Sequence, residues 1–305
     1  MKSIPLSLGM TLAFSSFAAF SVSDACSKLL GGKLDPFEVA FSGGVFGFLL
    51  LPFIRKKHET YMDIFSTGQP GMWILRAVAT FVATAASVKA FMLLPMPEAL
   101  SLMFLMPLFV TILSVGLLKE RVNGWAWVSV VLGFLGVLIV LRPGARELHF
   151  GHLCALVAAL ANAVGVIAYR LAGPDSARLS LFGSSLFGPL IGDGALMFTH
   201  ATWPHGFSIW FCLFGYGFLA ALGQLLMMMA TALAPANRVA LPQYSQMLCA
   251  VVFSYFLFHQ PLDGWTFAGI VVVTASGMIN WIRQHLRYER DVIEEYWKKQ
   301  HHHVH

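Results

Sequence analysis

The sequence predicts an all-α integral membrane protein of ten transmembrane helices, arranged as two inverted five-helix repeats. Three observations indicate this fold class. Hydrophobic residues make up 57% of the chain and charged residues only 11%, with a mean hydropathy of +0.71, whereas a soluble domain needs roughly a quarter of its residues charged. The apolar residues fall into ten runs of about the length of a membrane span. The second half of the chain also repeats the first.

The repeat is clearest between residues 89–125 and 229–265, which match at an offset of 140. The identical pairs include a Pro turn and a Gly-Trp turn, where backbone geometry restricts the residue type. Other segments extend the match, with 41–47 matching 182–188 at an offset of 141, and 9–29 matching 151–171 at an offset of 142. The eight identical pairs are Ala90/Ala230, Leu93/Leu233, Pro95/Pro235, Leu108/Leu248, Ser114/Ser254, Leu117/Leu257, Gly124/Gly264 and Trp125/Trp265.

The repeat predicts three parts of the chain: a first five-helix repeat over 1–143, a second over 144–282 and a cytoplasmic tail over 283–305. The first apolar run is too long for a signal peptide and leads directly into further spans, so we expect it to be retained. The expected spans are 5–30, 36–54, 71–94, 97–118, 125–141, 151–171, 179–199, 209–233, 238–258 and 264–282.

The distribution of Lys and Arg predicts the orientation. With the N-terminus in the cytoplasm, 15 of these residues fall on the inside and 5 on the outside, as the positive-inside rule requires. Ten spans return the C-terminus to the cytoplasm, and five helices per half invert the second half. We therefore expect a multi-pass protein of a bacterial inner membrane, and the net charge of +5 needs no nucleic-acid partner.

The sequence predicts no cofactor and no metal site. The four cysteines, Cys26, Cys154, Cys212 and Cys249, each lie singly in an apolar segment, where they are expected to be small buried hydrophobes. Residues 283–300 mix both charges and indicate an exposed or membrane-surface helix. The histidines of residues 301–305 could bind metal, but an ordinary His-rich tail explains them better.

Several motifs resemble those of the drug/metabolite transporter superfamily, in its EamA-type branch. They are Leu117-Leu118-Lys119-Glu120-Arg121, Gly133-x-x-Gly136 followed by Val-Leu-Ile-Val-Leu-Arg-Pro-Gly144, Ala90-x-x-Leu93-x-Pro95 with Pro107, and Gln243-Tyr244-x-Gln246 with Ser276-Gly277. The resemblance covers residues 5–282. Gln260 departs from it, because a Glu equivalent to Glu120 is common at that position.

The resemblance implies ten helices around a central cavity, lined by the first, third, fourth, sixth, eighth and ninth. It also implies a small organic substrate, since the superfamily carries amino acids, nucleobases, riboflavin, S-adenosylmethionine and drugs. We therefore expect a secondary transporter working by alternating access. A passive channel or facilitator is the main alternative. An intramembrane enzyme is a weaker one, because Ile191-Gly192-Asp193 matches only half of the GxGD protease motif.

Polar residues inside spans are the candidate substrate ligands, since each is costly in lipid unless it faces protein or water. Asp24 and Lys28 share a face of the first helix and either pair with one another or line the cavity. In the third helix, Arg76, Thr80, Thr84 and Ser87 form one stripe, whereas Lys89 points elsewhere. Arg76 is either a snorkelling anchor or a gating residue.

The second half supplies the remaining candidates. Asn162 and Tyr169 share a face of the sixth helix, where an interhelical hydrogen bond is the alternative role. Gln224 precedes three methionines in the eighth helix. The strongest candidates are Gln243, Tyr244 and Gln246 in the ninth helix, because amides and a phenol suit neutral or zwitterionic organic molecules.

Coupling to protons would need a carboxylate whose charge changes during transport. Asp24, Glu98 and Asp193 are the acids expected inside or beside spans. We expect Asp24 and Lys28 to orient the substrate, and Glu98 to be the titrating switch at the outer gate. Its repeat equivalent is Arg238, which cannot titrate. The expected partners are a small metabolite, the lipid bilayer and protons, and the protein is expected to be a monomer or a weak homodimer.

Overall fold

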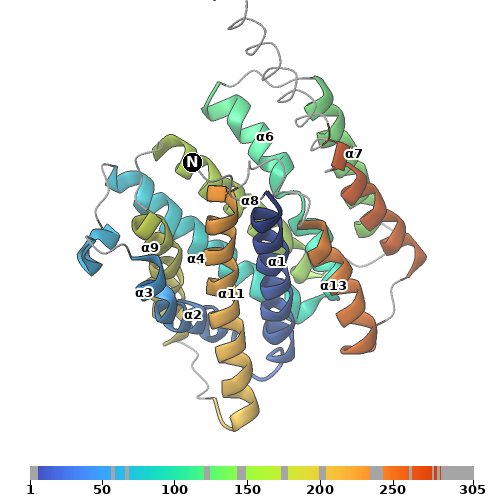
Figure 1. Ribbon diagram of the computed structural model, residues 1–305. Coiled ribbons are helices and arrows are strands. Elements are labelled where there is room, and N and C mark those ends of the chain that lie inside the picture. Colours follow the sequence, from blue (N-terminus) through green and yellow to red (C-terminus); the bar gives the residue numbers. More distant parts are fainter. Residues whose placement is uncertain are drawn as a thin grey trace, which may run out of the picture.

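The computed structural model describes residues 6–55, 59–65, 69–119, 124–142, 149–172, 178–198, 204–233, 243–260, 263–276, 278–279 and 282. Regular structure within these ranges is helical throughout (Figure 1). The predicted all-helical membrane fold is therefore confirmed. The tail over 283–305 lies outside the described residues, so the expectations for it stay untested.

The first repeat follows the expected order of helices. The long helices begin and end within two residues of the predicted spans. Its elements are α1 (Leu6–Leu29), α2 (Pro36–Gly47), η1 (Phe48–Leu50), α3 (Leu51–Ile54), η2 (Tyr61–Phe65), α4 (Pro70–Leu93), α5 (Met96–Met103), α6 (Met106–Leu117) and α7 (Gly124–Leu141).

The second repeat follows the same order. Its elements are α8 (Phe150–Ala172), α9 (Arg178–Gly188), the π-helical turn η3 (Pro189–Asp193), α10 (Gly194–Met197), α11 (Phe207–Leu233) and α13 (Gln243–Phe256). A further apolar helix covers Gly264–Ser276. Residues 234–242, which the sequence assigned in part to the ninth span, lie outside the described residues.

Three expected spans are interrupted at or near a proline. The span over 36–54 becomes α2, a 3₁₀ turn and α3, with Pro52 in α3. The span over 97–118 divides at Phe104–Leu105, before Pro107. The span over 179–199 contains the π-helical turn that begins at Pro189. Proline has no N–H to donate to the preceding turn, so a local change of helix type is the expected response.

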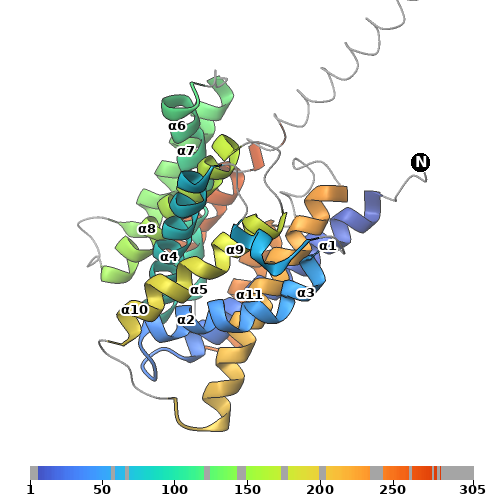
Figure 2. The same cartoon turned by 90° about the vertical axis from the view of Figure 1, so that its left-hand side faces the viewer.

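The helices pack in pairs that recur when the two halves are exchanged. Helix α1 packs along α11, and its repeat equivalent α8 packs along α4. In the same way α2 contacts α11, and α9 contacts α4. Figures 1 and 2 show α1 and α11 side by side, with α4 and α8 forming the matching pair. Each half therefore packs mainly against the other half, which is the arrangement expected of a two-repeat transporter.

Small residues and hydroxyl groups hold α1 against α11. Ser16 Oγ donates to the Gly223 carbonyl at 2.7 Å, and Ser23 Oγ donates to the Tyr216 carbonyl at 2.9 Å. Inside a membrane the hydrophobic effect does not drive helices together, so close packing and hydrogen bonds of this kind hold them instead. The second bond holds the backbone of Tyr216 against α1.

The outward faces of the helices are suited to lipid. Phe207 and Phe211 of α11 are 86% and 64% exposed, and Leu153 of α8 is 56% exposed. Among the described residues, five helical segments are long and apolar enough to cross a membrane, and three shorter apolar helices accompany them. The shorter helices cover Val130–Leu141, Ser245–Phe256 and Gly264–Ser276.

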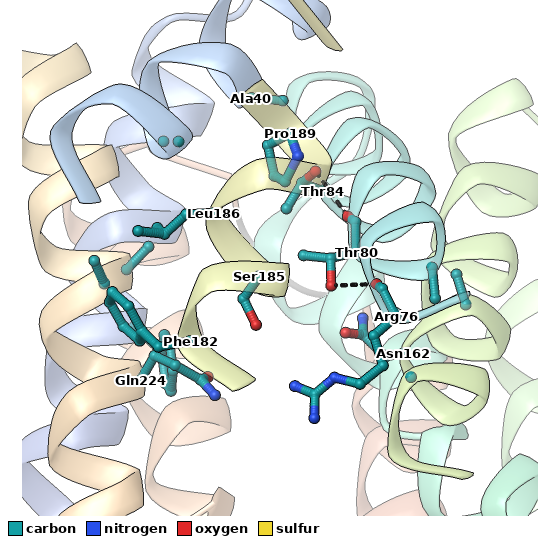
Figure 3. Close-up of a pocket in the computed structure, with 18 of the residues that line it drawn as sticks. Ala40, Arg76, Thr80, Thr84, Asn162, Phe182, Ser185, Leu186, Pro189 and Gln224 are labelled. Carbon is teal, nitrogen blue, oxygen red and sulfur yellow. Dashed lines mark hydrogen bonds between the residues drawn. The ribbon is translucent and has the colours of Figure 1, made fainter. Parts of the chain in front are cut away.

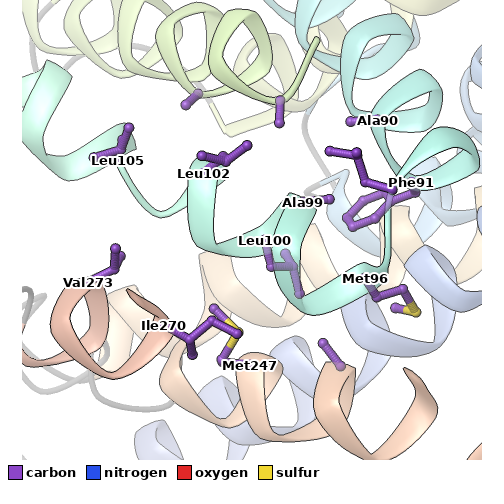
Figure 4. Packing of buried hydrophobic residues seen from close by; sticks show 14 of the residues in the cluster. Ala90, Phe91, Met96, Ala99, Leu100, Leu102, Leu105, Met247, Ile270 and Val273 are labelled. Atoms are coloured by element: carbon purple, nitrogen blue, oxygen red, sulfur yellow. The ribbon is translucent and has the colours of Figure 1, made fainter. Parts of the chain in front are cut away.

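The largest of the buried apolar clusters among the described residues joins the two halves (Figure 4). It brings the end of α4 and the helices α5 and α6 against α8, α13 and the Gly264–Ser276 helix. The residues labelled in Figure 4 are Ala90, Phe91, Met96, Ala99, Leu100, Leu102, Leu105, Met247, Ile270 and Val273. This packing fills the end of the molecule that lies beyond the cavity described next.

Candidate functional site

A cavity of about 900 Å³ lies between the two halves. Figure 3 shows Arg76, Asn162, Ser185 and Gln224 directed toward a common open space. The residues that line it are Phe20, Ala40, Gly43, Gly44, Arg76, Ala79, Thr80, Thr84, Met106, Ala161, Asn162, Gly165, Val166, Phe182, Ser185, Leu186, Pro189, Tyr216, Ala220, Ala221, Gln224, Met227 and Met228.

The lining combines broad apolar surfaces with a few convergent polar groups. Three aromatic rings and three methionines provide most of the large side chains. Hydroxyl groups, two amides and the guanidinium of Arg76 provide the polarity, and Arg76 carries the only full charge among the described lining residues. Such a mixture is typical of sites for organic molecules, where apolar surface supplies affinity and polar groups fix orientation.

Equivalent positions of the two repeats line the cavity in pairs. At the offset of 140, Arg76 corresponds to Tyr216, and Thr84 to Gln224. At the offset of 142, Phe20 corresponds to Asn162, and both line the cavity. The cavity therefore lies on the axis that relates the halves, although its opposite walls differ in chemistry.

The polar stripe of α4 forms one wall. Thr80 Oγ1 donates to the Arg76 carbonyl at 2.8 Å, and Thr84 Oγ1 lies 2.9 Å from the Thr80 carbonyl. On the facing helix α8, Asn162 Nδ2 donates to the Ala158 carbonyl at 2.9 Å. These local bonds satisfy the two hydroxyl donors and one N–H of Asn162 without a ligand, as is usual for hydroxyl side chains inside helices. The oxygen lone pairs remain as acceptors for a substrate.

A buried carboxylate lies behind this wall. Asp193, the last residue of η3, is fully buried, and its Oδ2 atom accepts a hydrogen bond from Thr84 Oγ1 at 3.2 Å. Its Oδ1 atom has no hydrogen-bond partner among the described residues. Thr84 thus connects the cavity to an acid that does not itself line it.

Two predicted ligands meet outside the cavity lining. Gln246 Nε2 of α13 donates to Asp24 Oδ2 of α1 at 2.7 Å. The contact joins the first half to the second, since α1 and α13 belong to different repeats. The sequence proposed both residues for the site without predicting that they bind each other.

The alternative in which Asp24 pairs with Lys28 does not occur. Lys28 Nζ instead donates to the carbonyls of Phe91 and Leu94, at 3.2 and 2.6 Å, and lies 5.3 Å from the centre of the Phe258 ring. The two carbonyls belong to the C-terminal end of α4, where the helix dipole favours a cation. Lys28 therefore fastens α1 to the end of α4.

Glu98 also has a partner that the sequence analysis missed. Its Oε1 atom lies 2.9 Å from His152 Nε2, and both side chains are buried. His152 Nδ1 lies 2.9 Å from the backbone nitrogen of His149 and 3.1 Å from its carbonyl oxygen. A neutral His152 can accept from the first of these, and a protonated one can donate to the second.

The remaining candidates divide into two groups. Lys89 lies outside the cavity lining, within electrostatic reach of Cys154. Tyr169, Gln243 and Tyr244 lie in helices, but their side chains lie outside the described residues, and so does all of Arg238. Among the described residues, no group of three or more His, Cys, Asp or Glu side chains could hold a metal ion.

Sequence reasoning found Arg76, Asn162 and Gln224 but did not select Phe20, Phe182, Ser185 or Tyr216 for the site. Aromatic residues and serines are too common in this chain to be conspicuous. The repeat offset was the available signal, because it maps Arg76 onto Tyr216 and Asn162 onto Phe20. His152 had no such signal, since its offset equivalent is Met10.

The cavity and the packed cluster occupy opposite ends of the same helices. The cavity uses Phe20 of α1 and the earlier half of α4, whereas Lys28 and the end of α4 are packed. The second half shows the inverse, because the cavity uses the later half of α8, while His152 at its start is packed. The cavity therefore lies toward one end of these helices, and packed side chains close the other end.

A cavity between two related helical halves, packed at one end, is typical of membrane transporters. Models of the EamA-like transporter family match residues 7–142 and 149–281. The chain belongs to this family. A solved crystal structure of a protein superimposes with a TM-score of 0.61 at 16% identity, covering 90% of this chain and 96% of that one, which supports the fold alone.

Curated relatives align over most of the chain. An S-adenosylmethionine uptake transporter of Rickettsia bellii (strain RML369-C) is 28% identical over 269 residues, covering 88% of this chain and 91% of its own. A riboflavin transporter of Rhizobium johnstonii (strain DSM 114642 / LMG 32736 / 3841) is 26% identical over 279 residues, covering 89% and 90%. A second riboflavin transporter, of Vibrio cholerae serotype O1 (strain ATCC 39315 / El Tor Inaba N16961), is 28% identical over 203 residues, covering 65% and 67%.

Proposed function

We propose that this protein is a secondary transporter that moves a small organic metabolite across the bacterial inner membrane by alternating access. The observation that carries the proposal is the cavity between the repeats, lined in equivalent pairs and closed at one end. Rocking of two related halves around such a cavity exposes it to each side in turn. The relatives named as S-adenosylmethionine uptake transporters and riboflavin transporters support the same class of activity.

The substrate class follows from the lining. A cavity of about 900 Å³ is large enough for a nucleoside-sized or vitamin-sized molecule. Phe20, Phe182 and Tyr216 provide flat apolar surface, while Asn162, Gln224 and the threonines can bind the polar edge of a ring. We therefore propose a heteroaromatic metabolite with polar substituents. The relatives named for S-adenosylmethionine and riboflavin carry molecules of this kind.

The described conformation is proposed to be open to the cytoplasm. In the predicted orientation, Arg76 lies near the inner end of its helix and Lys28 near the outer end of its own. The end of the helices that holds the cavity is then the inner end. Lys28 on the α4 carbonyls and the Glu98–His152 pair are proposed to hold the outer gate closed, with Arg238 at the equivalent position of the inner gate.

The other predicted ligands are proposed to act in the alternate state. Asp24 and Gln246 lie between the cavity and the closed end, so a substrate leaving through the outer gate would pass them. Lys89, Tyr169, Gln243 and Tyr244 are retained as ligands of that state. The monomer or weak homodimer remains the proposed assembly.

Tracer exchange separates a carrier from a passive channel. Purified protein in liposomes loaded with unlabelled S-adenosylmethionine should take up labelled S-adenosylmethionine faster than empty liposomes do, because a carrier returns faster when loaded. Parallel assays use riboflavin and adenosine. Equal uptake into loaded and empty vesicles for a compound that does permeate would contradict the carrier and favour a channel.

A thermal-shift screen identifies the substrate independently. A compound that binds only the folded state and is present at a concentration 100 times its Kd stabilises that state by about 2.7 kcal/mol. We expect a rise in the unfolding midpoint with a heteroaromatic metabolite and none with simple amino acids. Stabilisation by amino acids alone would contradict the proposed substrate class while leaving the transporter class intact.

A further inference from the structure

The side chain of Asp193 combines complete burial with an incomplete set of hydrogen bonds. It is 0% exposed, and only Oδ2 has a donor among the described residues, namely Thr84 Oγ1. The residue ends the π-helical turn that begins at Pro189, and Pro189 itself lines the cavity. Turns of this kind occur frequently at functional sites.

An unpaired carboxylate in this position is costly. The effective penalty for burying one ion is several kcal/mol, unless a countercharge or a full set of donors compensates it. A bound proton removes the charge. It needs only one free oxygen, which Oδ1 provides.

Among the described side chains, the elements around Asp193 do not bring a cation against it; the side chain of Arg178 in α9, which also packs against η3, lies outside that set. From α4 the facing charges are Arg76, about two helical turns before Thr84, and Lys89, which lies on another face of the helix. Helix α2 brings Glu38, which is engaged with the backbone of Asp35 at the start of that helix. Tyr216 of α11 is within electrostatic reach of both Asp193 and Asp24. Tyr216 and Asp24 bring no positive charge to Asp193.

Thr84 connects this acid to the cavity. Its hydroxyl lies within hydrogen-bond distance of the carbonyls of Thr80 and Phe81 as well as of Asp193 Oδ2, at 2.9, 3.0 and 3.2 Å. A hydroxyl has one proton to donate, so it serves one of these acceptors at a time. A substrate atom that accepts from Thr84 therefore takes the donor away from Asp193.

We propose that Asp193 is a proton-binding site of this transporter, coupled to substrate in the cavity through the hydroxyl of Thr84. The inference rests on the proposed transport function. When the Thr84 proton turns to the substrate, the carboxylate loses its donor and takes a proton from water. Substrate and proton then promote each other's binding, as linkage requires. This coupling produces symport.

The first test needs no substrate. Infrared titration of purified protein labelled with ¹³C-aspartate reports the C=O band of protonated aspartic acid. We expect a band that Asp193→Asn abolishes and that Asp63→Asn, which removes a labelled aspartate outside the cavity lining, leaves unchanged. A band unaffected by Asp193→Asn, or no band at any pH at which the protein is folded, would overturn the inference. A band that disappears when sodium replaces choline would assign the site to a metal cation instead.

Two further variants keep the test informative if Asp193→Asn does not fold. Asp193→Glu should retain a carboxylic-acid signal but move it out of the aspartate-labelled band. Thr84→Val removes the donor to the charged form, so the wild-type band should persist to higher pH. An identical titration in Thr84→Val would contradict the proposed link. Gel filtration confirms that each variant is monodisperse.

Transport assays then test the coupling. An inwardly directed proton gradient should drive accumulation of labelled S-adenosylmethionine in wild-type liposomes and in liposomes that carry Asp63→Asn, a change in η2 outside the cavity lining. Asp193→Asn should lose this accumulation yet keep exchange. If no variant transports S-adenosylmethionine or riboflavin, the proposed function fails, whereas the infrared titration still decides the proton site. Gradient-driven accumulation by Asp193→Asn would overturn the proton site.

Discussion

Gln224 provides a direct test of the cavity at the scale of one residue. Its side chain projects from α11 into the cavity opposite the α4 stripe. Gln224→Ala should weaken substrate binding roughly fivefold, because a hydrogen bond contributes about 1 kcal/mol. Dissociation constants measured with the compound found by thermal shift provide the readout. Gln69→Ala, just before α4 and outside the lining, is the matched control. Equal effects of the two substitutions on the dissociation constant would show that the cavity is not the binding site.

Asp263 provides a pH-dependent prediction outside the membrane spans. Partial burial would raise the pKa of its carboxyl, but contacts with Thr266 and the charge of Arg142 outweigh this and lower it. A lowered folded pKa stabilises the protein above the unfolded value of about 3.9, and the contribution is lost as pH falls through the folded pKa. Asp263→Asn should therefore lower the unfolding midpoint at pH 7, with the difference vanishing in acid.

The contact between Arg142 and Asp263 provides a control for this prediction. Both side chains are partly exposed, so the effect should be small and should shrink at high salt. In an Arg142→Gln background, Asp263→Asn should cost less than it does in wild type. Equal costs in the two backgrounds would show that the ion pair contributes nothing.

The predictability of the site differed from residue to residue. Arg76, Asn162 and Gln224 were found because a polar group inside a span is conspicuous. Lys28 was found too, but its partners were not, since carbonyls at the end of α4 leave no pattern in the sequence. The link from Thr84 to Asp193 spans 109 positions, and only the packing of η3 against α4 reveals it.

At the scale of helices, Gly269 tests the contact between the last helix of each repeat. A Cβ atom at Gly269 would lie 2.9 Å from the Gly136 carbonyl oxygen and 3.0 Å from the Val140 nitrogen. Backbone atoms cannot yield as a side chain can. Gly269→Ala should therefore lower stability by about 1–3 kcal/mol.

The control is Gly264→Ala in the same helix, where a Cβ atom meets nothing within 4 Å. Thermal unfolding in detergent should show a lower midpoint for Gly269→Ala and little change for Gly264→Ala. Equal unfolding midpoints for Gly269→Ala and wild type would mean that the close contact between α7 and the last helix does not contribute to stability. The Gly133-x-x-Gly136 motif of α7 would then have no packing role.

Sequence predicted the long helices well and their interruptions poorly. Apolar runs fix where α4, α8 and α11 begin and end, because lipid requires a minimum length of apolar helix. The apolar pattern does not predict whether a proline bends a helix, divides it or only changes its local hydrogen bonding. Pro107 follows a break, whereas Pro189 starts a π-helical turn, and the neighbouring helices decide between these outcomes.

At the scale of the whole molecule, the orientation is the main open prediction. After the native cysteines are replaced, a cysteine at His58 should be protected from an impermeant thiol reagent in intact cells, and a cysteine at Arg146 should react. Lysed cells, in which both should react, provide the control. Reaction at position 58 in intact cells would reverse the orientation and make the open end of the cavity face outward.

The whole fold was the most predictable feature. The composition required a membrane protein, and the internal match required two equivalent halves. The helix pairs α1–α11 and α4–α8 follow from that equivalence only once the halves are placed together. Which half supplies which wall of the cavity cannot be read from one repeat alone, since the offset relates positions without bringing them into contact.

The pairing of unlike residues across the cavity has a kinetic consequence. In the proposed alternating-access cycle, rocking exchanges the roles of the two halves. Equivalent positions carry different residues, with Arg76 matching Tyr216 and Thr84 matching Gln224, so the two states of the cavity would present different polar groups to the substrate. Half-saturation constants on the two faces should therefore differ. In the absence of a gradient the transport cycle can produce no net flux. Tighter substrate binding on one face must therefore be offset by slower reorientation of the carrier away from that face. A carrier whose halves had stayed identical would transport equally well in both directions, whereas in the proposed cycle divergence at these few positions gives the two faces different kinetics.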